Sequence, residues 1–349
     1  MTNLFRAILA LVALFFFVSA ASAWDRGAVQ RFATLPAGAP NPEGITVGHN
    51  GDVYVTGFDP TNPNGPGQVF VFDDNGRLDR TLLIEGASAA LLGLAFHPVT
   101  HELLVIDFGK GNVLRVSPHQ EKQAANIFSA IPGGGLNALT FDKAGNVYIS
   151  DSFRGTIWKT SASGGAAVNW KSDPLLTTTG FPPFGANGLD FNRAQDGLFV
   201  ANTGNDTVVL IRVVTDATGN AEVAPATADK PNILVFTNSI NGADGLFLDK
   251  HDNVWVCANQ ADEIVVTDKT GKAVAKLGDF DGVRNGSPVG LLFPASLARH
   301  GNWVYITNLS LDLRPITGQQ SVDSQWAAQV TRHTISRIRF RIPGADGDE

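Results

Sequence analysis

Residues 244–259 read Asp-Gly-Leu-Phe-Leu-Asp-Lys-His-Asp-Asn-Val-Trp-Val-Cys-Ala-Asn. This pattern predicts a short apolar strand, a polar turn and a second strand built around Val254, Trp255 and Val256. Related stretches begin at Glu43, Leu92, Asn137, Asn187 and Ala295. The unit therefore recurs about every 50 residues, a spacing typical of a repeat architecture.

Each copy continues into further short strands that are separated by turn-forming residues. In the first copy, strands are expected at 43–47, 53–56, 68–72 and 80–84, with the turn Asp73-Asp-Asn-Gly76 before the last of them. This succession is typical of a four-stranded antiparallel meander. Six such units predict an all-β fold, a six-bladed β-propeller, because each blade buries its faces only against neighbouring blades.

The two ends of the chain are expected to close the propeller. The sixth copy lacks an outer strand, and residues 29–36 form a strand pattern with no nearby partner. Pairing of these N-terminal and C-terminal strands would leave no long open edge. We expect residues 24–349 to form one propeller domain, interrupted by an insertion at 309–332 that covers one of its two faces.

The first 23 residues have the features of a signal peptide. Arg6 precedes an apolar run from Ala7 to Ser19, and Ala21-Ser-Ala23 matches a cleavage site. This predicts a periplasmic or secreted protein with no membrane attachment after cleavage, the alternative being an uncleaved anchor. Cys257 is the only cysteine and is expected to be a small buried hydrophobe.

Composition limits the classes of partner. The chain is 44% hydrophobic with a net charge of −7, as in soluble globular proteins, and it has no basic run. Nucleic acid is not expected as a partner, since its binding requires clustered Lys and Arg. A small-molecule substrate is expected instead. The sequence does not indicate the oligomeric state.

The first residue of each copy carries the functional information, because the innermost strands of a propeller surround one axis. Four of the six positions supply side-chain oxygen: Glu43, Asn137, Asn187 and Asp244. Carboxylate and amide oxygens are the ligands of a divalent cation, Ca²⁺ above all, with Mg²⁺, Mn²⁺ or Zn²⁺ as further possibilities. The alternative is that these residues only cap turns, since Asn-Gly and Asp-Gly are common turn dipeptides.

The series Glu43-Gly, Asn137, Asn187-Gly and Asp244-Gly resembles the SMP-30/gluconolactonase/LRE-like family, and the strands Val-Tyr-Ile-Ser-Asp and Leu-Phe-Val-Ala-Asn fit NHL-type propellers as well. The resemblance implies that Glu43, Asn187 and Asp244 are metal ligands. It further implies that Asn137 is shared between metal and substrate and that Asp244 is the general base.

Two features depart from the family pattern. The family's Asn-Asp-Gly motif in blade three, often preceded by an arginine that holds a sugar lactone, is replaced here by Gly135-Leu-Asn-Ala138. Specificity for gluconolactone is therefore not expected. Phe181 and Phe184 directly precede Asn187 and are expected to contact substrate at the rim of the channel.

These observations predict a metal-dependent hydrolase of a lactone or related ester, with Asp244 or Glu43 activating water. A non-enzymatic binding or scaffold propeller with a structural Ca²⁺, or with no metal, is the main alternative. A lyase of the virginiamycin-lyase kind is a third possibility, although no histidine occupies a first position of a repeat.

Overall fold

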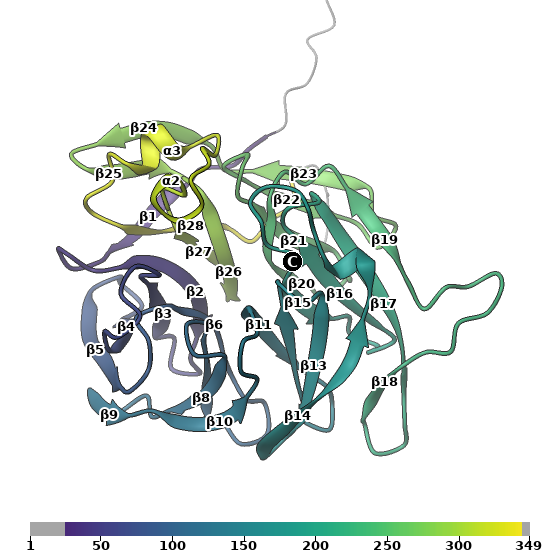
Figure 1. Ribbon diagram of the computed structural model, residues 1–349. Coiled ribbons are helices and arrows are strands. Elements are labelled where there is room, and N and C mark those ends of the chain that lie inside the picture. Colours follow the sequence, from purple (N-terminus) through teal and green to yellow (C-terminus); the bar gives the residue numbers. More distant parts are fainter. Residues whose placement is uncertain (1–24, 344–349) are drawn as a thin grey trace, which may run out of the picture.

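The computed structural model describes residues 25–343. Its strands form six blades around one axis, which confirms the predicted six-bladed β-propeller (Figure 1). The innermost strands of the blades are β2, β6, β11, β15, β20 and β26, and they contact one another in a closed circuit. The predicted signal peptide lies outside the described residues. Within them, no helix is both long and apolar enough to cross a bilayer.

Blades 1 to 3 follow the predicted meander, each strand pairing antiparallel with the next. Blade 1 contains β2 (Asn41–Val47), β3 (Val53–Phe58), β4 (Gly67–Phe72) and β5 (Leu78–Glu85). Blade 2 contains β6 (Leu91–Phe96), β7 (Leu103–Asp107), β8 (Asn112–Val116) and β10 (Asn126–Ala130). Blade 3 contains β11 (Leu136–Phe141), β12 (Val147–Asp151), β13 (Thr156–Ser161) and β14 (Gly164–Ser172).

Blades 4 and 5 repeat this order with one elaboration. Blade 4 contains β15 (Ala186–Phe191), β16 (Gly197–Asn202), β17 (Thr207–Thr215), β18 (Ala221–Val223) and β19 (Ile233–Asn238). Here β17 pairs with both β18 and β19, and the loop between those two strands extends from the body of the molecule (Figure 1). Blade 5 contains β20 (Ala243–Leu248), β21 (Val254–Ala258), β22 (Glu263–Thr267) and β23 (Ala273–Leu277).

Blade 6 joins the two ends of the chain, as predicted. It contains β26 (Pro294–His300), β27 (Trp303–Asn308) and β28 (Thr334–Arg339), and its outer strand is β1 (Gln30–Thr34). β1 pairs antiparallel with β28, with Gln30 opposite Arg337 and Thr34 opposite Thr334. Phe32 of β1 packs edge-on against Tyr305 of β27, with ring centroids 4.7 Å apart.

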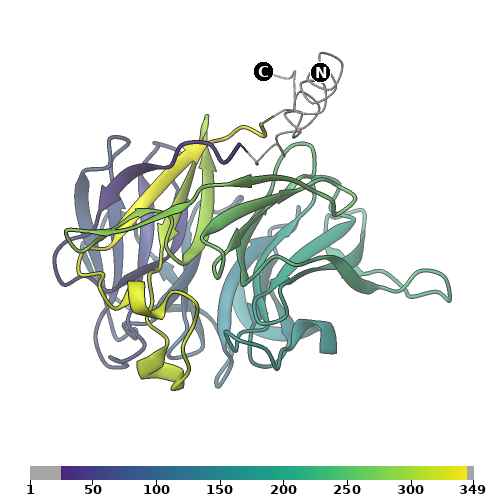
Figure 2. The same ribbon diagram turned by 90° about the horizontal axis from the view of Figure 1, so that it is seen from above.

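Several short elements lie outside the six-fold repeat. β9 (Lys122–Ala124), a segment of the second copy, pairs in parallel with the outer strand of blade 1. A 3₁₀ turn η1 (Pro174–Leu176) precedes blade 4, and β24 (Phe280–Arg284) with β25 (Ser287–Gly290) forms a hairpin before blade 6. The insertion carries two one-turn helices, α2 (Arg314–Thr317) and α3 (Ser324–Ala327), which lie at the lower edge of the molecule in Figure 2.

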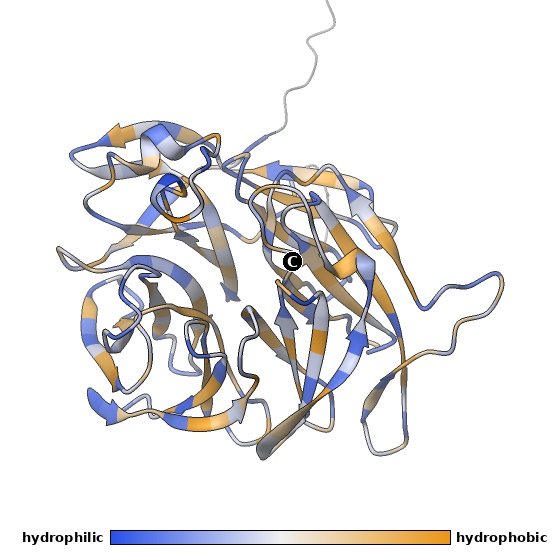
Figure 3. Cartoon of the chain, viewed as in Figure 1, coloured by the Kyte–Doolittle hydropathy of each residue, from blue (hydrophilic) through white to orange (hydrophobic). Residues whose placement is uncertain are grey.

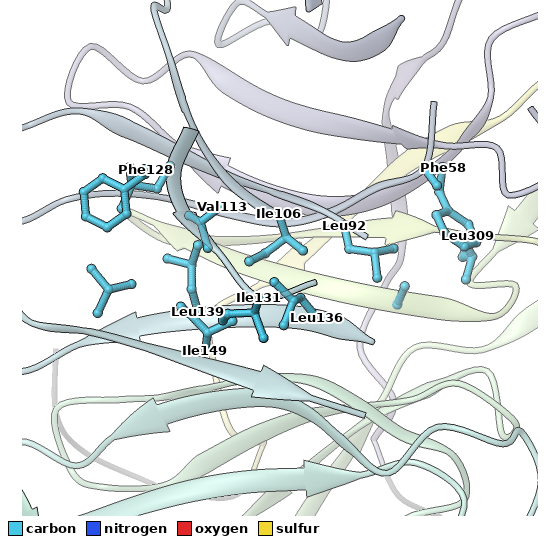
Figure 4. Close-up of a cluster of buried hydrophobic side chains, with 14 of the residues drawn as sticks. Phe58, Leu92, Ile106, Val113, Phe128, Ile131, Leu136, Leu139, Ile149 and Leu309 are labelled. Carbon is cyan, nitrogen blue, oxygen red and sulfur yellow. The ribbon is translucent and has the colours of Figure 1, made fainter. Parts of the chain in front are cut away.

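Apolar side chains of adjacent blades form the core. The strands carry most of the hydrophobic residues in Figure 3. Figure 4 shows one such cluster, which extends from Phe128 through Ile106 and Leu136 to Leu92, and on to Phe58 and Leu309. Because Leu309 belongs to the insertion, the blade core continues into the segment that covers the propeller.

Candidate metal centre

A β-bulge in every innermost strand directs one residue to the axis. In β15, Ala186 pairs with Asn202 and Leu189 with Val200, so two residues oppose one on the neighbouring strand. The same irregularity occurs in the other five innermost strands. A bulge bends the strand and redirects a side chain. The bulged pairs are Glu43-Gly44, Leu92-Gly93, Asn137-Ala138, Asn187-Gly188, Asp244-Gly245 and Ala295-Ser296.

The second residue of each bulge is small because neighbouring blades approach one another closely there. A Cβ atom at Gly188 would lie 2.6 Å from the carbonyl oxygen of Asp244, and one at Gly245 would lie 2.6 Å from that of Ala295. Such distances are too short for any side-chain carbon. Blade packing therefore requires the glycine of each Asn-Gly and Asp-Gly pair. It does not determine the residue before the glycine, which is available for a functional role.

Hydroxyl groups on the second strand hold some of these bulges in place. Thr307 Oγ1 accepts a hydrogen bond from the amide of Ser296 at 3.0 Å and donates to the carbonyl oxygen of Glu43 at 2.6 Å. Thr56 makes the equivalent pair of bonds to the amide of Gly44 and the carbonyl of Leu92. Each threonine thus satisfies the bulge of its own blade and anchors the axial residue of the next.

The structure brings the four predicted oxygen donors together. Glu43, Asn137, Asn187 and Asp244 line one pocket of about 40 Å³. Each is only 4–5% exposed. The other lining residues are Phe58, Leu92, Pro182, Phe184, Thr203, Asn259, Phe293, Leu309, Leu311 and Leu313. No histidine is among these lining residues, so the lyase alternative gains no support.

The two carboxylates occupy an electrostatically unfavourable position. Burial raises the pKa of Glu43, and the charge of the neighbouring Asp244 raises it further. Burial also raises the pKa of Asp244, against the opposing effect of hydrogen bonds from Asn259, Asn187 and the backbone of Gly245. Glu43 Oε2 and Asp244 Oδ1 are buried without a hydrogen-bond partner among residues 25–343. Two buried carboxylate oxygens without partners are energetically costly unless a proton or a cation lies between them.

Neighbouring side chains orient the donors. The side-chain nitrogen Nδ2 of Asn187 donates to Thr203 Oγ1 at 3.0 Å, and Nδ2 of Asn137 donates to Ser152 Oγ at 3.4 Å. Each bond uses the amino group, so the side-chain carbonyl oxygen stays available as a ligand. Asn259 donates to Asp244 Oδ2 at 2.8 Å, which leaves Asp244 Oδ1 free. Partners of this kind fix the geometry of metal ligands.

The donor set fits a hard divalent cation. Two carboxylates balance a charge of +2, and amide oxygens are common Ca²⁺ ligands. Residues 25–343 contain no cluster of three or more His, Cys, Asp or Glu side chains arranged to hold a metal ion. A cation here would depend on Glu43, Asp244 and the asparagine oxygens, which favours Ca²⁺ over Zn²⁺.

The insertion lies on the same face as the donors. Leu309, Leu311 and Leu313 line the pocket. The amide of Leu309 donates to the carbonyl of Phe293 at 3.0 Å. Phe293 also lines the pocket and has a positive φ of 50°, a strained conformation for a bulky residue. Its amide donates to Asp262 Oδ1 at 2.7 Å, so Asp262 and Leu309 together hold it in that conformation.

The structure places the two predicted rim phenylalanines, Phe181 and Phe184, in different surroundings. Phe184 lines the pocket, whereas Phe181 is not among the lining residues and packs against the core cluster between blades. The structure therefore gives no support for substrate contact by Phe181. Sequence reasoning did not identify Thr203, which lies directly after the second strand of blade 4. Asn259 lies directly after the second strand of blade 5, and the sequence suggested turn capping for it and for other strand-end residues. The equivalent of Thr203 and Asn259 in blade 3 is Ser152, which bonds Asn137, whereas Asp151, one residue earlier, mainly bonds loop backbone.

The wider cavity at the other end of the channel is chemically different. It measures about 330 Å³, and its ionisable lining residues are Asp190 and Arg299. Asp190 Oδ1 accepts a bond from Thr140 at 3.2 Å, and Oδ2 accepts one from the amide of Leu248 at 3.0 Å. Since both oxygens of Asp190 are satisfied, the smaller pocket is the better candidate site despite its size.

The fold and pocket together define a class: a six-bladed propeller with buried oxygen donors on its axis. The family described as SMP-30/Gluconolactonase/LRE-like region matches residues 99–278, just over half of the chain. The protein belongs to this family, as the resemblance in its sequence predicted. No curated protein matches the chain in sequence.

Solved structures with the same fold share little sequence with this chain. A luciferin-regenerating enzyme has a TM-score of 0.60 at 15% identity, covering 89% of this chain and 95% of its own. Regucalcin from Agrobacterium tumefaciens, described as a calcium-binding protein, has a TM-score of 0.59 at 13% identity, covering 90% and 94%. A gluconolactonase from Xanthomonas campestris has a TM-score of 0.58 at 12% identity, covering 92% and 93%. At these identities the likeness concerns the fold.

Proposed function

We propose that the protein is an exported, divalent-cation-dependent hydrolase of a lactone or related ester. One observation carries the proposal: Glu43 and Asp244 are buried side by side, each with a carboxylate oxygen that lacks a partner among the described residues. Membership of a family that includes gluconolactonases in its description supports the reaction class. The calcium-binding description of the Agrobacterium structure supports the choice of ion.

Glu43, Asn187 and Asp244 would hold the cation, and Asn137 would lie between cation and substrate. A bound divalent cation would polarise the substrate carbonyl and stabilise the negative charge that develops on its oxygen. Asn259 orients the Asp244 carboxylate, which would accept a proton from the attacking water. Glu43 neutralises charge and does not transfer protons in this scheme.

Cation binding should be detectable as stabilisation. We expect Ca²⁺ to raise the melting temperature of the wild-type protein, because it relieves repulsion between buried carboxylates and binds only the folded state. Glu43→Gln and Asp244→Asn should abolish that increase and lower the hydrolysis of γ-butyrolactone at least about 100-fold. Melting curves with EDTA or Ca²⁺, metal analysis and a pH-indicator assay measure these effects.

Asp190→Asn is the matched control, since it removes a carboxylate at the other end of the same channel. It should keep both the Ca²⁺-dependent stabilisation and the activity. Wild-type protein that binds no divalent ion, with melting and hydrolysis indifferent to EDTA, would refute the proposal. Metal binding by Glu43 and Asp244 without turnover of any lactone or ester would favour the scaffold alternative.

A further inference from the structure

The pocket that holds the donors is polar only on the axis itself. Thr203 and Asn259 are the remaining polar lining residues, and each already bonds a donor residue. The pocket contains no arginine or lysine. A polyhydroxylated substrate would therefore lose hydrogen bonds to water and find few in return, which weakens binding strongly.

Four phenylalanines extend this apolar character outward, one from each of blades 1 to 4. Phe58 and Phe108 have ring centroids 5.9 Å apart, and Phe108 and Phe153 are 5.7 Å apart. Phe153 and Phe184 are 5.6 Å apart. Phe58 and Phe184 line the pocket, whereas Phe153 is 57% exposed. We call this cluster the phenylalanine rim. It forms a continuous apolar path from solvent to the donors.

The insertion supplies the opposite wall of the pocket. Leu311 and Leu313 line it, and Leu311 also borders a second cavity of about 290 Å³ beneath α2 and α3. The pocket of about 40 Å³ has room for a few waters, whereas ligand pockets usually exceed about 300 Å³. Leu311 is the lining residue that the two cavities share, so displacement of its side chain would widen the small pocket toward Pro315 and Ile316 of the second cavity, whose lining also includes polar residues such as Asn41 and Asp59.

We propose that the substrate is a neutral ester or lactone with an aliphatic or aromatic substituent, which packs between the phenylalanine rim and Leu311. This proposal rests on the hydrolase function proposed above and assigns its substrate class. The reacting carbonyl faces the donors, and the substituent lies against Phe184. Water adds to the carbonyl carbon, the acyl–oxygen bond breaks, and the alkoxide leaving group takes the proton that Asp244 received from that water.

The test compares γ-butyrolactone, γ-octalactone and glucono-δ-lactone in Ca²⁺, together with binding of two lactams that resist hydrolysis, 2-pyrrolidinone and its 5-butyl derivative. Each buried methylene strengthens binding about fourfold. We expect kcat/KM for γ-octalactone to exceed that for both other lactones at least about tenfold. The butyl lactam should bind more tightly by a similar factor.

Three variants locate the effect. Phe184→Ala should reduce the preference of the enzyme for γ-octalactone over γ-butyrolactone to about threefold or less. Leu311→Ala should shift the preferred chain length upward, because it opens the second cavity. Ile127→Ala is the matched control: Ile127 is 55% exposed on an outer strand, comparable to Phe153, and its loss should change no ratio.

The outcomes separate the two proposals. If glucono-δ-lactone is the best substrate, or if chain length has no effect on hydrolysis or lactam binding, the substrate class is wrong and the hydrolase function stands. If no lactone is hydrolysed but the butyl lactam binds more tightly in a Phe184-dependent manner, the apolar site stands and the hydrolase function fails. If neither hydrolysis nor selective lactam binding occurs, both are refuted.

Discussion

The axial residues are free to carry function because backbone geometry, and not their own packing, determines where they lie. In each bulge the small second residue meets the neighbouring blade, and the first residue faces the axis. Glu43 shows this separation. Its carbonyl oxygen is held by Thr307, while its carboxylate has an oxygen without a partner in the described chain. A single atom of Thr307 therefore positions the ligand without touching its reactive group.

Replacing Thr307 by valine should show what its hydrogen bonds contribute to the position of Glu43, because valine preserves the packing of the side chain. The change keeps the shape of the side chain but leaves the buried amide of Ser296 and carbonyl of Glu43 unpaired, so we expect a loss of about 1–3 kcal/mol in the free energy of unfolding. The affinity for Ca²⁺ should fall as well. Urea denaturation and calcium titration measure the two effects.

Thr267→Val is the matched control for this prediction. Thr267 is also buried on a strand, but its Oγ1 has no hydrogen-bond partner among residues 25–343. Removing an unpaired buried hydroxyl should be neutral or stabilising. Equal losses for both variants would show that the hydrogen bonds of Thr307 do not position Glu43.

At the scale of elements, the insertion is fastened to blade 5 through a pair of acidic side chains. Asp323, just before α3, lies close enough to Asp262, in the turn between β21 and β22, for its charge to act on that carboxyl group. Burial raises the pKa of both groups; the charges of Asp323 and Asp279 raise that of Asp262 further. Asp323 Oδ2 is buried without a hydrogen-bond partner among residues 25–343, and Asp262 Oδ1 accepts a bond from the amide of Phe293 beside the pocket.

The raised pKa values of Asp262 and Asp323 predict that the stability of the protein depends on pH. Since both pKa values lie above the ordinary value of about 4, the folded protein binds more protons than the unfolded chain. The free energy of unfolding should therefore fall as the pH rises above about 4, until both groups are ionised. Asp323→Asn removes one of the two neighbouring charges and can donate a hydrogen bond to Asp262, so we expect it to gain about 1–3 kcal/mol over the wild type at pH 8.

Denaturation of both proteins at pH 5 and pH 8 measures this difference, and hydrogen exchange over residues 309–332 locates it. Asp312→Asn is the control within the same insertion. Its hydrogen bonds with Arg314 lower the pKa of Asp312, so its loss should be most harmful at high pH, the opposite trend. If Asp323→Asn follows the wild type at both pH values, the pair does not fasten the insertion.

The sequence predicted the elements that repeat and missed those that do not. Comparison of six copies revealed the blades and the first column, because packing imposes the same pattern on every copy. β9 spans three residues and joins a neighbouring copy, and the β24–β25 hairpin occurs only once, so neither has a period to compare. The phenylalanine rim also lacks a common position: Phe58 ends β3, Phe108 follows β7 by one residue, and Phe153 follows β12 by two. Its contacts depend on the three-dimensional curvature of the blades.

At the scale of the whole molecule, closure depends on the pairing of β1 with β28. Deleting residues 25–36 would expose the edge of β28 and the ring of Tyr305, so we expect a lower melting temperature and aggregation. A peptide of residues 25–38 should restore the melting temperature by adding the missing strand, and the same peptide with Phe32→Asp should not. Thermal melting and size-exclusion chromatography measure both results.

Shortening the exposed loop at residues 225–230 is the control for a deletion of chain, and it should leave the melting temperature nearly unchanged. A truncated protein that melts like the full-length chain would show that β1 is dispensable. The prediction follows from topology, because the N-terminal β1 is the outer strand of blade 6 and covers the edge of the C-terminal β28.

The pairing of β1 with β28 also determines when the axial site can assemble during synthesis of the chain. Of the strands in residues 25–343, β1 is synthesised first and its partner β28 last, and Thr307, which positions Glu43, lies in the strand just before β28. The axial donors therefore cannot all be held in place before β27 and β28 are synthesised. A chain that terminates early would carry Glu43, Asn137, Asn187 and Asp244 in its sequence without assembling them. Assembly of the site thus depends on the synthesis of the last described blade.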